Sequence, residues 1–150
     1  MIDYLVMGLF SRRRIPDLNP LRDEVLQELR GLVADFGKVF PAEQRFRGIL
    51  ERAPSLVEGQ LPRLDAFGEL DLEREVKDPL EQEDVLTTLG GAQHIPQMIQ
   101  SLAKVLQEEK QDRCLLELHD RAGQVGVRLE GLIHLWVLKN GGLDALLGDE

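Results

Sequence analysis

Apolar residues recur at intervals of three and four positions along most of this chain, which is the spacing of one face of an α-helix. The clearest stretch has its apolar face at Leu21, Val25, Leu29, Leu32, Phe36 and Val39. Asn19 followed by Pro20 is a typical helix start, because asparagine caps free N–H groups and proline has none to leave unpaired. Pro41 is a stop signal. We predict a long amphipathic helix from Pro20 to about Phe40.

Two shorter helices are predicted to follow. The first spans about 41–52 and ends before Pro54, because proline disfavours helix in the residue that precedes it. The second spans about 55–70, where Gly59 and Pro62 should kink or split it. The spacing of apolar residues in both stretches predicts an inward side, but their boundaries are soft.

The next predicted helix begins after Asp78, an N-cap residue that is followed by a proline in the first turn. Gly90 and Gly91 are expected to end it, since glycine is the commonest residue after a helix C-terminus. Pro96 then starts a further helix with its own apolar face. No helix-breaking residue follows before Gly123, so this helix is expected to continue through 111–119.

The last predicted helix carries the only tryptophan of the chain. Its inward stripe is Val125, Leu129, Leu132, Ile133, Trp136 and Val137. Asn140 and the two glycines after it form a typical helix end. The stretch 125–131 also alternates like a β-strand, and each glycine there weakens a helix by about 1 kcal/mol, so a strand remains an alternative.

These elements predict an all-α fold, a single compact domain of five or six helices in orthogonal or bundle-like packing. The domain is expected to span 15–150, with 1–14 as an apolar and basic tail. Composition agrees with this class, because leucine is common while aromatic residues make up only 5% of the chain.

The tail 1–14 has three interpretations. The first is a tail packed against the domain, and the second places the native start of the chain at Met7. The third is a weak contact with a membrane surface, in which apolar side chains enter the bilayer and arginines meet anionic lipid. The residues for that contact are Leu5, Leu9, Phe10, Arg12, Arg13 and Arg14. The membrane interpretation is not favoured, because the net charge of −9 opposes binding to anionic lipid. The positive charge follows the apolar residues, the reverse of a secretory signal.

Negative charge is concentrated in one segment, 69–84, which carries −6 of the net −9. Its acids are Glu69, Asp71, Glu73, Glu75, Asp78, Glu81, Glu83 and Asp84. Such a surface repels phosphate backbones, so we expect no direct nucleic-acid binding. The segment is either an ordinary solvated surface or a docking surface for a protein with a basic patch. An extreme form of the second would be an acidic inhibitor that mimics nucleic acid and targets a nucleic-acid-binding protein.

Four apolar residues are interleaved with these acids: Leu70, Leu72, Val76 and Leu80. In a docking surface, charge would supply association rate and selectivity while apolar contacts would supply affinity. We therefore expect these four side chains to contribute to the surface.

Groups for bond-making chemistry are few. His134 and Trp136 could line a pocket or an interface, although the favoured interpretation is a histidine bonded to Glu130 and a tryptophan that anchors the core or an interface. The possible metal donors Cys114, Glu117, His119, Asp120, Glu130 and His134 form no close ligand pairs, so no metal site is expected. The single cysteine suits a reducing, cytoplasmic location and is interpreted as an inert, buried thiol.

We conclude that the sequence predicts a non-enzymatic protein–protein interaction module (an adaptor, regulator, chaperone or assembly factor) with no cofactor. Its partner is expected to be another protein with a basic surface, and self-association into a homo-oligomer is possible because two helices are strongly apolar. The main alternative is a helical small-molecule or metal-binding sensor, with a pocket lined by Trp136, His134 and Cys114.

Overall fold

The computed structural model describes residues 15–39, 52–110 and 113–141. These residues form the helices α2 (Leu18–Lys38), α3 (Ala53–Glu58), α4 (Leu61–Glu69), α5 (Pro79–Lys110) and α6 (Arg113–Lys139). No strand occurs within the described ranges, so the predicted all-α class is confirmed.

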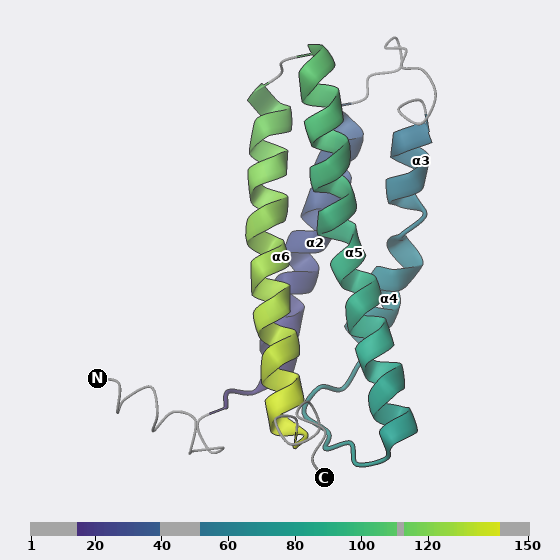
Figure 1. Ribbon diagram of the computed structural model, residues 1–150, viewed down its shortest axis with the longest axis vertical. Helices are drawn as coiled ribbons and strands as arrows, with labels where there is room; N and C mark the ends of the chain where they lie inside the picture. Colours follow the sequence, from purple (N-terminus) through teal and green to yellow (C-terminus); the bar gives the residue numbers. More distant parts are fainter. Residues whose placement is uncertain (1–14, 40–51, 111–112, 142–150) are drawn as a thin grey trace, which may run out of the picture.

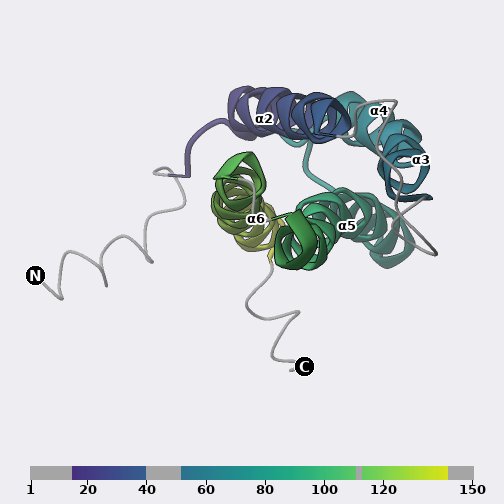
Figure 2. The same ribbon diagram turned by 90° about the horizontal axis from the view of Figure 1, so that it is seen from above.

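The helices form a bundle in which successive columns run in opposite directions (Figure 1). α3 and α4 follow one another as a single broken column. Seen from above, this column lies beside α2 in one layer, and α5 lies beside α6 in the other (Figure 2). The described chain therefore packs as four columns, and the expectation of five or six packed helices is wrong. The packing is bundle-like rather than orthogonal.

The core is a single apolar cluster shared by all four columns. On α2 and α6 the predicted stripes face inward, and the buried residues are Val25, Leu29, Leu32, Phe36, Val125, Leu129, Leu132 and Trp136. No polar or charged side chain of the described residues is buried. Burial of each large apolar side chain contributes about 1.5–3 kcal/mol, which is what holds four amphipathic columns together.

α5 is one continuous helix, which corrects the expected stop at Gly90 and Gly91 and the expected new start at Pro96. A buried stripe continues across these positions at helical spacing, through Leu89, Ala92, Ile95 and Ile99. Its packing against the bundle outweighs the helix cost of about 1 kcal/mol for each glycine and about 3 kcal/mol for the proline. Pro96 also faces Gly126 of α6, where an added Cβ would lie 3.8 Å from the ring.

Most other predicted features occur close to their expected places. Gly59 separates α3 from α4, so the split in that region is confirmed. The stretch 125–131 is helical, which removes the strand alternative, and α6 ends before Gly141, whose φ is +79°. α6 begins at Arg113, so 113–119 belongs to it and does not prolong the preceding helix. The helix predicted at 41–52 lies almost wholly outside the described residues.

α2 begins at Leu18, so Asn19 lies within the first turn and is not the N-cap residue. Its side chain is used for a long-range contact, described below.

Candidate interaction surface

The acidic segment (69–84) runs from the last residue of α4 through the connecting loop 70–78 into the first turns of α5, at the end of the bundle where α2 begins and α6 ends (Figure 1). Seven of its eight acids are exposed, and Glu81 is half-buried. Residues 70–78 form no regular helix or strand, so their backbone needs other partners to hold its shape.

Apolar side chains anchor this loop to the core instead of covering its outer surface. Leu72 and Val76 are 0% and 3% exposed, and Leu70 is partly buried against the core. The expectation that all four interleaved apolar residues contribute to a surface is therefore wrong for these three. Leu80 alone of the four is exposed, at 71%. The loop crosses the open end of the bundle, so its apolar side chains cover core that would otherwise meet water.

Two asparagines, Asn19 in the first turn of α2 and Asn140 directly after α6, hold the loop backbone, and we call them the asparagine clamps. Asn19 Oδ1 accepts a hydrogen bond from the N–H of Leu72 at 2.8 Å. Asn140 Oδ1 accepts one from the N–H of Val76 at 2.7 Å. Asn140 Nδ2 also donates to a carbonyl in the last turn of α6 at 2.9 Å. The first and the last described helices thus fix the same loop.

Some of the acids also take part in this structure. Asp71 accepts hydrogen bonds from Asn19 Nδ2 at 3.0 Å and from the N–H of Glu73 at 3.2 Å. Glu81 forms an ion pair with Arg74. Four other carboxylates form no hydrogen bond or ion pair with another described residue, and these are Glu69, Glu75, Glu83 and Asp84. The segment therefore presents negative charge that no other described residue pairs with, on a backbone that is fixed in place.

The hydrogen bond from Asn19 is the main cause of a lowered pKa at Asp71, followed by the bond from the backbone of Glu73. Such a carboxylate stabilises the fold above its unfolded pKa, and that stabilisation is lost as the pH falls through its folded pKa. We predict that Asn19→Ala raises the pKa of Asp71 toward its ordinary value of 3.8. An NMR titration of the carboxyl carbon between about pH 2 and 6 measures this change.

Asp35 is the internal control for that titration. A hydrogen bond from Arg121 is the main cause of its lowered pKa, so Asn19→Ala should leave it unchanged. An unmoved Asp71 carboxyl in Asn19→Ala would show that Asn19 does not hold it.

The residues proposed for a pocket lie apart. Trp136 is 2% exposed and belongs to the core, whereas His134 is exposed and forms no hydrogen bond with the equally exposed Glu130. The indole Nε1 of Trp136 is buried and has no hydrogen-bond partner among the described residues.

Cys114 is exposed, so its interpretation as a buried thiol is wrong. It lies in the first turn of α6, about 33 Å along the helix from Trp136, because each residue advances about 1.5 Å. The pocket of Trp136, His134 and Cys114 expected for a sensor is therefore not formed. His119 contacts its neighbour Asp120 at 3.2 Å. Across the described ranges, no three possible metal ligands cluster together.

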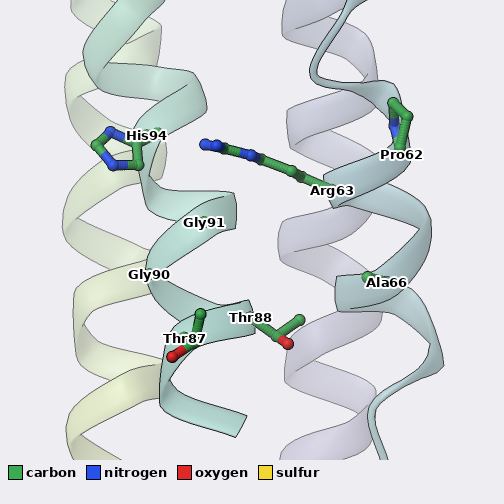
Figure 3. Close-up of a pocket in the computed structure, with 8 residues that line it drawn as sticks. All are labelled: Pro62, Arg63, Ala66, Thr87, Thr88, Gly90, Gly91 and His94. Carbon is green, nitrogen blue, oxygen red and sulfur yellow. The ribbon is translucent and has the colours of Figure 1, made fainter. Parts of the chain in front are cut away.

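The structure contains a groove that the sequence did not indicate, between α4 and α5. Its volume is about 540 Å³. α4 contributes Arg63 and Ala66 among others, and α5 contributes Thr87, Gly90, Gly91 and His94 among others (Figure 3). The glycine pair could have indicated it, had the helix been expected to continue through them.

A second hollow, of about 440 Å³, lies between α2 and α6. It is crossed by ion pairs of Arg128 with Glu24 and Glu28, and Arg121 beside it pairs with Asp35. Its charges are thus paired within the protein.

Comparisons with protein-family models, with curated proteins and with solved structures found no match to this chain. Of the helices that the structure describes, none is long and apolar enough to cross a membrane. The six residues suggested for membrane-surface contact, between Leu5 and Arg14, lie outside the described residues.

Proposed function

We propose that this protein is a non-enzymatic interaction module that binds a basic partner protein through its acidic segment. The observation that supports this most directly is the fixed loop. Buried Leu72 and Val76 and the two asparagine clamps hold its backbone while unpaired carboxylates face the solvent. A surface that is already ordered loses less conformational entropy on binding than a flexible acidic loop would.

The chemistry of the surface suits a partner with clustered lysine or arginine side chains. Negative charge at Glu69, Glu75, Glu83 and Asp84 would increase the association rate and select against acidic proteins. Leu80, which is 71% exposed among these acids, offers one apolar contact that charge alone cannot supply. We therefore assign affinity to Leu80 and not to the other three apolar residues expected from the sequence, Leu70, Leu72 and Val76.

The proposal predicts that the four acids without a partner among the described residues contribute more to partner binding than the same number of acids elsewhere on the surface. Neutralising them should weaken capture of a specific partner from a native lysate by at least about tenfold, with little effect on folding. The substitutions are Glu69→Gln, Glu75→Gln, Glu83→Gln and Asp84→Asn. Quantitative pull-down at low and at physiological salt measures the loss, and higher salt should weaken capture by the unaltered protein.

A matched control removes the same charge from exposed acids of other regions: Glu58→Gln, Glu108→Gln, Glu117→Gln and Glu130→Gln. A partner that is captured by this control and lost by the test variant supports the proposal. Equal loss in both variants would mean that net charge alone is responsible. Undiminished capture by the test variant would exclude the acidic segment as the docking surface.

A further inference from the structure

On its α5 side the groove between α4 and α5 is lined by Gly90 and Gly91, in the interior of a long helix, and we call this stretch the floor of the groove (Figure 3). Glycine weakens a helix at such positions, so its presence needs a reason. A Cβ added to Gly90 would meet no atom within 4 Å, and one added to Gly91 would meet Arg63 Cδ at an ordinary 3.6 Å. By contrast, a Cβ on Gly123 would lie 2.8 Å from the Gln100 side chain.

Packing within the described chain therefore does not require glycine at positions 90 and 91. What the two glycines do is leave the floor of the groove free of side chains. Alanine at either position would strengthen the helix and would fill part of the open space above it.

A cation borders this open floor. Arg63 extends from α4 toward α5, on the side where His94 lies (Figure 3). Five other arginines of the described chain pair with carboxylates, for example Arg30 with Asp65 at 3.1 Å, whereas Arg52 and Arg113 do not. The guanidinium of Arg63 has no hydrogen bond or ion pair with a residue of the described chain. In a protein of net charge −9, an unpaired guanidinium at the edge of a groove is available to an anion from outside.

We propose that this groove binds a small organic molecule with one carboxylate on an apolar body. The guanidinium of Arg63 would hold the carboxylate through two parallel hydrogen bonds, the geometry that suits this pair. The apolar body would lie along Gly90, Gly91 and Ala66. A single guanidinium balances a single negative charge, which favours a monoanion. The volume of about 540 Å³ falls within the usual range of small-molecule sites, about 300–1,000 Å³.

Octanoate is a suitable probe because it joins one carboxylate to a slender apolar chain. Titration into the ¹⁵N-labelled full-length protein should shift the amide signals of Thr87, Gly90 and Gly91 in a saturable way. Octan-1-ol, which lacks the charge, and acetate, which lacks the apolar chain, should bind at least about tenfold more weakly, since each omits one half of the proposed recognition.

Two variants test the roles of charge and open floor. Arg63→Gln should weaken octanoate binding roughly tenfold, while Arg113→Gln, at an exposed position on α6, should leave it unchanged. Gly90→Ala should raise the melting temperature by about 2–4 °C and still weaken octanoate binding. Higher thermal stability together with weaker octanoate binding is expected only if the absence of a side chain at Gly90 leaves space for the ligand.

Three results would overturn the proposal. One is the absence of shifts at the groove with millimolar octanoate, and another is shifts confined to other regions, such as the core around Trp136. The third is equal affinity in Arg63→Gln and the unaltered protein. The experiment does not involve the acidic segment, so its outcome is independent of the proposed docking function.

Discussion

Trp136→Ala is expected to lower the free energy of unfolding by about 3–5 kcal/mol, a large loss for a single substitution. Trp136 is the largest of the fully buried side chains and lies in the inward stripe of α6. Its truncation would remove apolar burial and leave a cavity that the surrounding helices can only partly close. Urea denaturation followed by circular dichroism at 222 nm measures the loss.

Trp136→Phe separates the effect of the apolar volume of the indole from the effect of its buried N–H. Phenylalanine keeps most of the apolar volume and removes the buried Nε1–H, which has no hydrogen-bond partner among the described residues. An unsatisfied buried donor costs about 1–3 kcal/mol, so its removal should offset part of the lost packing. We expect Trp136→Phe to lose less than half of what Trp136→Ala loses. If Trp136→Phe and Trp136→Ala lowered the free energy of unfolding equally, removal of the N–H would bring no gain. That result would indicate that the N–H has a hydrogen-bond partner in solution.

The asparagine clamps should control the local stability of the acidic loop. In the double variant Asn19→Ala/Asn140→Ala, amide hydrogen exchange at Leu72 and Val76 is expected to accelerate about ten- to hundredfold. Each substitution removes the acceptor of a loop N–H, an effect of about 1–3 kcal/mol on local opening. Hydrogen-exchange NMR measures both amides, and core amides of α6 such as that of Leu129 serve as the reference.

The single variants provide the matched controls for this experiment. Asn19→Ala should release mainly Leu72, and Asn140→Ala should release mainly Val76. A uniform acceleration across the whole protein would mean that the clamps support the entire bundle. Unchanged exchange in the double variant would mean that apolar anchoring and the remaining side-chain bonds to the loop, from Arg22 to the carbonyl of Leu70 and from Gln82 to that of Val76, are enough to order it.

The double variant Asn19→Ala/Asn140→Ala also tests whether binding by the acidic segment would depend on charge alone or on an ordered loop. It retains all eight acids, so charge-driven steering is preserved. If binding depends on an ordered surface, its affinity for the partner should fall, through faster dissociation more than slower association.

Helical spacing in the sequence was sufficient to predict the elements with a regular apolar face. The inward residues of α2 and the stripe of α6 that includes Trp136 lie where the spacing places them. The start of α5 at Pro79 was also predictable, because the signals there are local.

Predictions failed where a distant part of the chain decides the local structure. Gly90, Gly91 and Pro96 are local stop or start signals, but packing of the long apolar stripe of α5 overrides them. Asn19 looks like a cap, yet its side chain bonds to Leu72, 53 positions away. In the irregular loop there is no period to show which side is buried, so the inward direction of Val76 could not be read from spacing.

The same long-range bonds make the acidic surface dependent on the completed fold. Val76 is held by a residue 64 positions further along the chain, and Leu72 by one 53 positions earlier. During synthesis the carboxylates emerge long before α6 exists to fix them. A nascent or truncated chain would carry the full charge of the segment without its final arrangement, so the proposed docking surface would form only in the finished molecule.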